Sequence, residues 1–288
     1  MAKKVKLVYI LGCGRSGSTL LDMILGNHKK IISTGECQFF DMEKISSNNN
    51  QFWKKVANIY KDKLVKNNRD INDVKSIKNC RYISLKEILK INNLGIPNNF
   101  KDNQCLNNFL FDNLLLFETI QEVSKKNILI DSSKTISRLF HLYNSKMFDI
   151  KVIYLHRNGL AFVNSGYKKG LTNIQSSLHW TIRNYRSQKL LKQCNLEYLE
   201  ISYDNLVNET ESTISSICNF LKLDFKKSML NFSKNQNLIG GNPVMRDNNN
   251  FKIEGNIQWK KSLSLFDKLI FGFIGGKMNK KLGYNYFG

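Results

Sequence analysis

The residues best suited to chemistry lie close to the amino terminus, in the segment Gly12–Thr19, which reads GCGRSGST. An apolar run, Lys6–Leu11, precedes it with the composition of a buried strand, and Ser18–Leu25 has the pattern of a helix. Glycines allow a backbone to approach an anion closely, and the N-terminus of a helix offers unpaired N–H groups. The segment therefore predicts a site for a phosphate-like group.

Two general nucleotide-binding motifs fit this segment in part. Gly12, Gly14 and Gly17 have the GxGxxG spacing of dinucleotide-binding enzymes, and Glu36 follows at a suitable distance. Gly12 and Gly17 also have the spacing of the kinase motif GxxxxGK[ST], but Ser18 occupies the place of the lysine. The dinucleotide motif does not account for the arginine inside the loop or for the two hydroxyl residues after its last glycine, and the kinase motif lacks its lysine here.

A third motif accounts for the whole loop. Arg15, Ser16, Gly17, Ser18 and Thr19 resemble the [KR]SG[ST][ST] core of the 5′-phosphosulfate loop in sulfotransferases that use 3′-phosphoadenosine 5′-phosphosulfate (PAPS). The resemblance implies that the cation and the loop amides hold the 5′-phosphate and the sulfonate of PAPS.

A second stretch resembles the 3′-phosphate motif of the same family. In Val152–Lys169, Arg157 follows an expected strand and Ser165 lies eight residues later, within an expected helix. An arginine at a strand end can bind a phosphate through two N–H groups at once. The resemblance therefore implies that Arg157 and Ser165 hold the 3′-phosphate of PAPS.

A third stretch, GGNPVMR, resembles the family's loop that closes over PAPS. The resemblance implies that Gly240, Gly241 and Arg246 approach the 3′-phosphate, with Trp259 and Lys260 following the loop. A plain loop is the alternative interpretation of this stretch. Tyr203 also matches a family position after a strand, and there the alternative is a packing tyrosine.

Transfer of a sulfuryl group to a hydroxyl requires a base for the hydroxyl proton. The cytosolic small-molecule sulfotransferases carry a His in a Lys-Thr-His segment, whereas this chain has Lys134, Thr135 and Ile136. Glu36, in TGECQFFD, resembles instead the catalytic Glu of the tyrosylprotein and heparan sulfate sulfotransferases. The resemblance implies that Glu36 is the base and that Lys134 neutralises charge on the oxygen between phosphorus and sulfur.

Short apolar runs alternate with helical patterns along the chain, which predicts an α/β fold with a parallel sheet. We expect strands at Lys6–Leu11, Ile31–Thr34, Asn127–Asp131, Lys151–Leu155 and Leu196–Ser202. Helical patterns fill most of residues 42–126, and a last helix is expected at about Ser262–Ile274. The prediction is a single P-loop-like, three-layer domain over residues 1–288, with a helical insertion at about 42–126 that forms the acceptor pocket.

The composition is globular with a large excess of positive charge, 44 Lys and Arg against 23 Asp and Glu. A polyanionic partner such as nucleic acid would explain the net charge of +21. Only eight of the cations are arginines, however, and Lys, Asn and Ile are all abundant, as in proteins encoded by AT-rich genomes. We therefore expect no nucleic-acid partner.

The cysteines indicate a reducing compartment. Six cysteines form neither a CxxC pattern nor a Cys/His cluster, so we expect no metal site. The amino terminus lacks the features of a signal peptide, and no apolar run reaches the roughly 18 residues of a membrane span. These features favour a cytoplasmic protein without a transmembrane segment.

The combined motifs predict a PAPS-dependent sulfotransferase that releases 3′-phosphoadenosine 5′-phosphate (PAP). Its acceptor would be a hydroxyl of a small molecule, a lipid or a saccharide. Three alternatives stay open: a nucleotide-dependent kinase in which Asp131 binds a metal, a nucleic-acid-binding protein, and a dinucleotide oxidoreductase.

Overall fold

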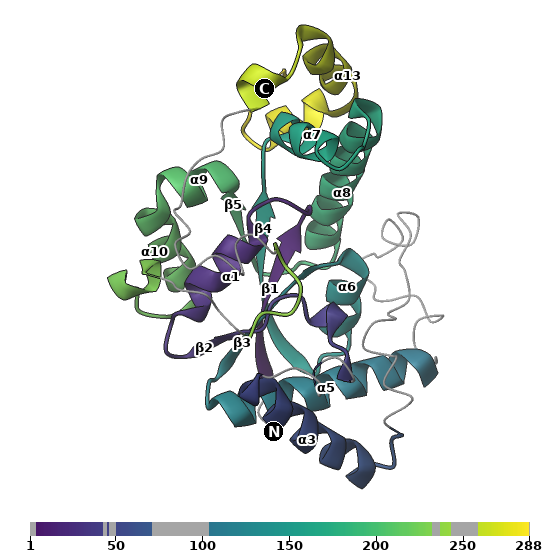
Figure 1. The fold of residues 1–288 in the computed structure, drawn as a ribbon, viewed down its shortest axis with the longest axis vertical. Coiled ribbons are helices and arrows are strands. Elements are labelled where there is room, and N and C mark those ends of the chain that lie inside the picture. Colours follow the sequence, from purple (N-terminus) through teal and green to yellow (C-terminus); the bar gives the residue numbers. More distant parts are fainter. Residues whose placement is uncertain are drawn as a thin grey trace.

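A five-stranded parallel sheet forms the centre of the fold, with the strand order β2-β3-β1-β4-β5. The computed structural model (Figure 1) describes residues 4–42, 45, 50–70, 104–231, 237–242 and 259–287. The strands are β1 (Val5–Gly12), β2 (Ile31–Ser33), β3 (Ile128–Lys134), β4 (Phe148–His156) and β5 (Tyr198–Ser202). All five expected strands are present, which confirms the predicted α/β fold with a parallel sheet.

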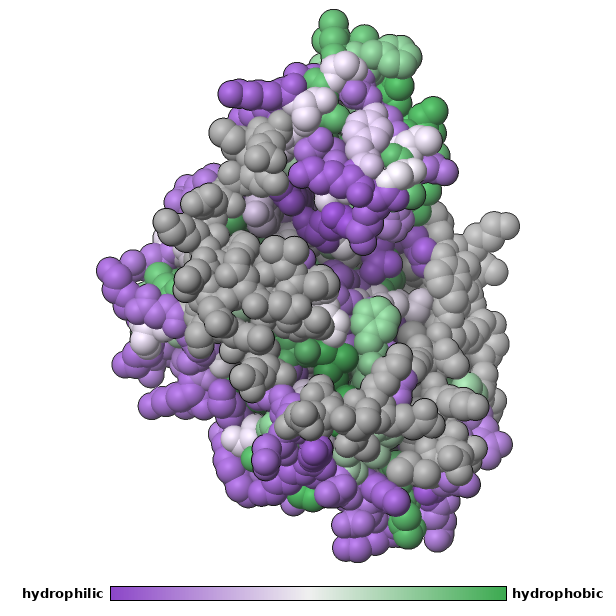
Figure 2. All heavy atoms as spheres, viewed as in Figure 1, coloured by the Kyte–Doolittle hydropathy of each residue, from purple (hydrophilic) through white to green (hydrophobic). Residues whose placement is uncertain are grey.

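Alternate residues of the strands enter two separate cores. On β1, Leu7, Tyr9 and Leu11 belong to one core, and Val8 and Ile10 belong to the other. Because parallel strands are covered on both faces, their sequences are apolar throughout rather than alternating. With these side chains buried, most of the described surface in Figure 2 is hydrophilic.

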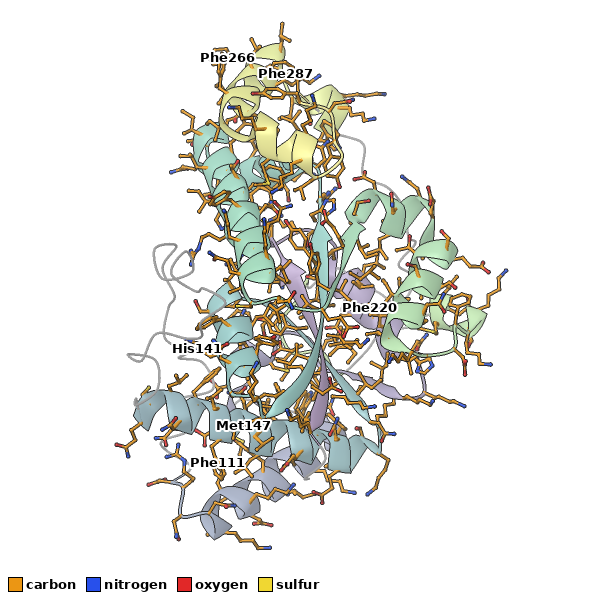
Figure 3. The ribbon with its side chains drawn as sticks, turned by 180° about the vertical axis from the view of Figure 1, so that it is seen from behind. Phe111, His141, Met147, Phe220, Phe266 and Phe287 are labelled. Atoms are coloured by element: carbon orange, nitrogen blue, oxygen red, sulfur yellow. The ribbon has the colours of Figure 1, made fainter. Side chains whose placement is uncertain are left out.

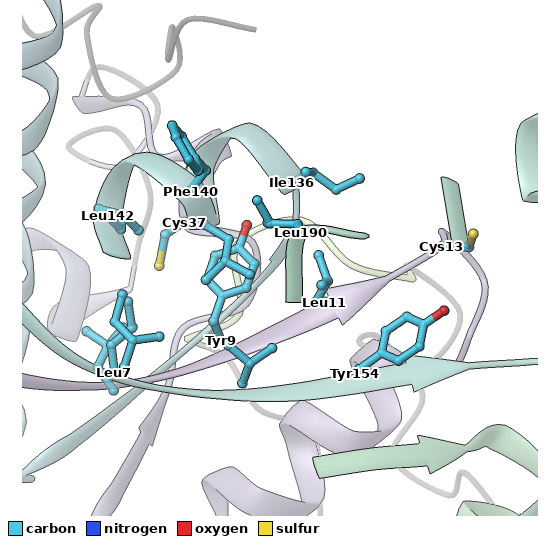
Figure 4. Close-up of a cluster of buried hydrophobic side chains, with 14 of the residues drawn as sticks. Leu7, Tyr9, Leu11, Cys13, Cys37, Ile136, Phe140, Leu142, Tyr154 and Leu190 are labelled. Carbon is cyan, nitrogen blue, oxygen red and sulfur yellow. The ribbon is translucent and has the colours of Figure 1, made fainter. Parts of the chain in front are cut away.

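Helices cover both faces of the sheet and make the predicted three layers. One face carries α1 (Ser18–Gly26), α9 (Tyr203–Asn208) and α10 (Thr210–Leu221). The other face carries α5 (Gln104–Ser124), α6 (Ile136–Asn144) and α8 (Asn173–Gln193), seen from behind in Figure 3 with Phe111 on α5 and His141 on α6. Figure 4 shows part of the core on this face, the one that contains Tyr9, where Phe140 of α6 and Leu190 of α8 lie over the Tyr9 ring.

Four further helices lie outside these two sets. They are α3 (Gln51–Lys66), α7 (Gly159–Tyr167), α12 (Trp259–Ser262) and α13 (Leu265–Lys281), and short 3-10 turns occur at Cys37–Phe39 and Lys227–Leu230. Helix α13 starts at a Ser264–Asp267 capping box and continues past the expected end at Ile274. It continues because Gly275 and Gly276 let Phe271 and Tyr286 pack directly against the helix backbone.

Residues 42–126, expected to be a helical insertion, contain the helices α3 and α5, which pack against each other. Residues 71–103 lie outside the described residues. The insertion as the acceptor pocket, and the single domain over 1–288, stay predictions.

Candidate active site

The glycine loop connects β1 to α1 at the carboxyl edge of the sheet. Gly17 is the N-cap of α1 and has a left-handed backbone with φ of +92°. A Cβ atom at Gly17 would come within 2.6 Å of the ring of Tyr203, so this position requires glycine. Ser16 donates from its Oγ to the carbonyl of Cys13 at 2.8 Å, and Ser18 and Thr19 are buried in the first turn of α1. The loop therefore presents the N-terminus of α1 as predicted.

Two arginines meet at one end of this loop. Arg15 Nη1 donates to Ser165 Oγ at 2.5 Å, and Arg157 Nη1 donates to the carbonyl of Arg15 at 3.2 Å. The Arg157 guanidinium lies 4.1 Å from the centre of the Tyr203 ring, a cation–π contact. The structure thus brings Arg15, Arg157, Ser165 and Tyr203 together, although they come from three different parts of the chain.

The charge of these arginines is not balanced by the protein within the described residues. No described carboxylate forms an ion pair with Arg15 or Arg157. Burial lowers the pKa of Arg157, yet an arginine keeps its charge at neutral pH. A half-buried cation, Arg157, and an exposed one, Arg15, beside a helix N-terminus have the charge to bind a phosphate dianion.

Glu36 and Lys134 form an ion pair at the other end of the loop, with 2.8 Å between Glu36 Oε1 and Lys134 Nζ. Each side chain is only 12% exposed. They meet because β2 and β3 are neighbours, Glu36 follows the carboxyl end of β2, and Lys134 is the last residue of β3. Gln38 Nε2 donates to Glu36 Oε2 at 3.2 Å, so both carboxylate oxygens of Glu36 have a partner.

Lys134 is held in an unusual backbone conformation with φ of +65°. Its Nζ also donates to the carbonyl of Ser132 at 3.0 Å. Arg183, on α8, donates to the carbonyls of both Lys134 and Gly12. Sequence analysis assigned no such role to Arg183, because donation to backbone carbonyls leaves no motif in the sequence.

Buried polar groups support the strand ends beneath the ion pair. Ser132 Oγ donates to Asp22 Oδ2 at 2.6 Å, and burial raises the pKa of Asp22 to about 7. Asp131 pairs with Arg138 at 2.7 Å in the fully buried interior. Asp131 is therefore part of the scaffold, which removes the metal ligand that the kinase alternative required. The other three residues, Asp22, Ser132 and Arg138, are not marked by a motif.

Two thiols lie close to the site but are poor nucleophiles. Burial raises the pKa of Cys13 to about 12 and that of Cys37 well above its ordinary value. Since the thiolate is the reactive form, both side chains are neutral packing groups at neutral pH.

The segment 237–242 closes the site on the Glu36 side. Ile239 bridges Gly35 in parallel orientation, with Glu36 N donating to the Ile239 carbonyl at 2.7 Å. Gly241 N donates to Glu36 Oε1 at 3.2 Å, and Asn242 N donates to Thr19 Oγ1 at 3.0 Å. Gly240 and Gly241 thus lie beside Glu36 and Thr19 rather than beside the arginines. The predicted Arg246 lies outside the described residues.

Residues 4–42, 45, 50–70, 104–231, 237–242 and 259–287 contain no group of three or more His, Cys, Asp or Glu that could hold a metal ion. Among the helices within these same ranges, none is both long enough and apolar enough to cross a membrane.

The geometry defines a class of protein: a P-loop-like α/β fold with a glycine loop, neighbouring arginines and a carboxylate–lysine pair at one edge of the sheet. The chain belongs to the sulfotransferase family, whose model matches residues 8–227. Sulfuryl transfer by this family favours the sulfotransferase prediction over the kinase, oxidoreductase and nucleic-acid alternatives.

Two solved structures share the fold over nearly the whole chain. The sulfotransferase domain from the Synechococcus PCC 7002 olefin synthase is 19% identical with a TM-score of 0.59, and the match covers 99% of this chain and 98% of that chain. The sulfotransferase domain from the curacin biosynthetic pathway is 18% identical with a TM-score of 0.55, covering 99% of both chains. No curated protein sequence matches this chain.

Proposed function

We propose that this sulfotransferase uses PAPS as its donor and transfers the sulfuryl group to an acceptor hydroxyl by in-line displacement. The observation that carries the proposal is the separation of two charged centres along one loop. Arg15, Arg157 and Ser165 form one centre through their hydrogen bonds, and the Glu36–Lys134 ion pair forms the other. A nucleotide with phosphates and a sulfonate needs cations at one end and proton-transfer groups at the other.

The donor occupies the arginine end through its phosphates. Arg15 and the amides of the Gly17–Thr19 turn hold the 5′-phosphate and the sulfonate, and Arg157 with Ser165 holds the 3′-phosphate. Tyr203 supports this geometry because its ring packs against both Gly17 and Arg157. We expect no metal in the reaction, since these cations stabilise the charge of the donor.

Chemistry takes place at the Glu36–Lys134 pair. The acceptor oxygen forms a bond to sulfur while the bond from sulfur to the bridging phosphate oxygen breaks, and Glu36 takes the hydroxyl proton. Lys134 stabilises the negative charge that develops on the bridging oxygen, and PAP leaves with that oxygen. Gln38 and the Gly241 amide fix the orientation of the Glu36 carboxylate.

We further propose that the reaction takes place in the cytoplasm, on a hydroxyl of a small molecule, a lipid or a saccharide. The cysteines support a reducing compartment, because the five that lie within the described residues are all free.

Calorimetric titration of the metal-free protein with PAP tests the donor assignment, with ATP and NAD as controls. We expect a dissociation constant in the micromolar range or below for PAP and much weaker binding of ATP and NAD. Binding of ATP or NAD in preference to PAP would contradict the proposal. A screen of hydroxyl acceptors with PAPS then identifies the acceptor class.

A further inference from the structure

Charge is segregated at one end of the molecule. Helices α7, α8, α12 and α13 pack together, and we call residues 157–194 and 259–287, which contain them, the helical cap. The cap holds 13 of the 44 Lys and Arg residues but only one of the 23 Asp and Glu residues, Asp267. A genome-wide preference for lysine raises the number of cations everywhere, but it does not remove acidic residues from one region.

The single carboxylate of the cap is used inside the cap. Asp267 accepts hydrogen bonds from the Tyr167 hydroxyl, from Asn173 Nδ2 at 3.0 Å and from the Ser264 backbone N–H at 3.0 Å. These bonds hold the pKa of Asp267 at about 2, below its ordinary value. Asp267 therefore fixes the start of α13 against α7 and α8 and leaves the outer surface of the cap positive.

Large apolar side chains cover the outer face of α13. Leu265, Leu269 and Phe273 follow at four-residue spacing and are 74%, 42% and 88% exposed, and Phe266 beside them is 71% exposed. Figure 2 shows hydrophobic atoms gathered at this end of the molecule, and in Figure 3 Phe266 lies at its outer tip. Single exposed apolar residues are ordinary, but a row of four along one helix marks a contact surface.

Exposed lysines border this apolar row on both sides along the chain. Lys260 and Lys261 precede α13, and Lys277, Lys280 and Lys281 follow Phe273 on its last turns. The inner face of the helix is fixed to the cap by Phe271 and by the close contacts at Gly272 and Gly275. The row is therefore a preformed apolar surface, bordered by lysines, that needs no folding step to bind.

We propose that the helical cap binds the surface of an anionic phospholipid bilayer, with the apolar row of α13 in the boundary between headgroups and acyl chains. Interfacial helices combine these two features, bulky apolar residues on the buried face and lysines at its borders. A nucleic acid would use the lysines but offers no apolar layer for Phe266 and Phe273. A bilayer with anionic headgroups can contact both the lysines and the apolar row. Its negative surface potential attracts the cap, and its apolar interior accommodates the row.

Co-sedimentation with vesicles tests this proposal without any activity measurement. We expect the full chain to pellet with phosphatidylcholine vesicles that contain about 30% phosphatidylserine and to bind at least about tenfold more weakly to pure phosphatidylcholine vesicles. Raising the salt from 0.1 M to 1 M shortens the screening length from about 10 Å to about 3 Å and should release much of the protein. Trp259 fluorescence offers a second signal of insertion close to α13.

Matched variants separate the apolar contribution from the basic one. Phe266→Asn with Phe273→Asn should reduce vesicle binding by about tenfold or more, while Val65→Asn, at a 62% exposed position on α3, leaves it unchanged. Lys277→Gln with Lys281→Gln should weaken binding several-fold, in contrast to Lys54→Gln with Lys61→Gln on α3. PAP titration of every variant checks that the fold is intact.

Three outcomes would overturn the proposal. The first is no sedimentation with phosphatidylserine vesicles, and the second is equal loss of binding in the α3 controls. The third is a concentration-dependent dimer, measured by light scattering, that Phe273→Asn dissociates while vesicles fail to bind. In that case the α13 row is a contact between two copies of the chain.

Discussion

The charged side chains around the glycine loop differ in whether they have an ion-pair partner. At the arginine end, Arg15 and Arg157 donate to a hydroxyl and a carbonyl and have no ion pair with a described carboxylate. At the carboxylate end, Lys134 already pairs with Glu36 at 2.8 Å. Under the proposed function, the groups that bind the donor and the groups that carry out the chemistry therefore differ in how their charge is paired. The arginine end leaves net positive charge for a ligand, whereas the carboxylate end is neutral overall and polarised.

Replacing Glu36, the proposed base, should have the largest effect on turnover. Glu36→Gln removes the proton acceptor but keeps a side chain of similar shape, so turnover should fall by about two to four orders of magnitude. Affinity for PAP should be largely kept, because the arginine end is untouched. Initial rates with PAPS measure the turnover, and calorimetry with PAP measures the affinity.

The matched control for this change is Glu197→Gln. Glu197 also pairs with a lysine, Lys151, at 2.7 Å, but it precedes β5 and lies away from the loop. Normal turnover is expected for that variant. Retained turnover in Glu36→Gln would remove Glu36 from the mechanism.

Replacing Arg157 should have the opposite effect, a larger change in PAP affinity than in turnover. Arg157→Ala should weaken PAP binding by about 10- to 100-fold, since hydrogen bonds to charged groups contribute about 1.5–3 kcal/mol. Turnover at saturating PAPS should change less than affinity does. Unchanged PAP affinity would contradict the assignment of the 3′-phosphate, and Lys192→Ala, at the end of α8, serves as the control.

Much of the site was predictable from the sequence, but the contact between Glu36 and Lys134 was not. The loop, the strand ends and the residues Glu36, Lys134, Arg157 and Ser165 are all marked by local patterns. The direct contact of Glu36 with Lys134, 98 positions later, depends on β2 lying next to β3, and no local pattern specifies strand order. The same holds for Arg183, because its partners are backbone carbonyls.

Helix α6 was also missed, for a physical reason. Its first turn contains Arg138, which is buried, and its last turn contains His141, which is also buried. Apolar residues do recur at helical spacing along α6, but the helix has only nine residues and follows β3 almost directly, so this short stretch did not stand out as a separate element. The ion pair of Arg138 with Asp131 compensates for burial only after β3 and α6 have packed together.

The pH dependence of the free energy of unfolding tests the role of Asp22, one of the buried polar groups beneath the Glu36–Lys134 pair. Because the pKa of Asp22 is raised to about 7, the folded chain keeps this proton between about pH 4 and pH 7 while the unfolded chain releases it. Stability should therefore fall as the pH rises through this range, by at most about 1.4 kcal/mol per pH unit from this group. Asp22→Asn should remove that part of the slope.

Urea unfolding of the wild-type chain and the Asp22→Asn variant at pH 5, 6 and 7 measures the difference. Asn keeps an oxygen that accepts from Ser132, so the hydrogen bond at this position is retained. Asp62→Asn, at an exposed position on α3, is the control and should leave the slope as it is. Parallel slopes for the wild type and Asp22→Asn would show that Asp22 does not titrate in this range.

The smallest effect is expected at Ser165. Ser165→Ala removes the acceptor of the Arg15 Nη1 hydrogen bond and one hydroxyl for a phosphate. A neutral hydrogen-bonding group contributes about 0.5–1.5 kcal/mol, so PAP affinity should fall by about 2- to 10-fold. Ser212→Ala on α10 should leave affinity unchanged. A loss as large as that of Arg157→Ala would mean that Ser165 orients Arg15 as well as binding phosphate.

The attachment of Glu36 to the segment 237–242 has a consequence for the order of events during synthesis. The hydrogen bonds from Glu36 N to Ile239 and from Gly241 N to Glu36 Oε1 connect positions about 200 residues apart. A nascent chain emerges from the ribosome amino terminus first, so Arg15, Lys134 and Arg157 are all present well before these bonds can form. The carboxylate of Glu36, the proposed base, is therefore fixed only after residues 237–242 have been synthesised, later than Arg15, Lys134 and Arg157 become available.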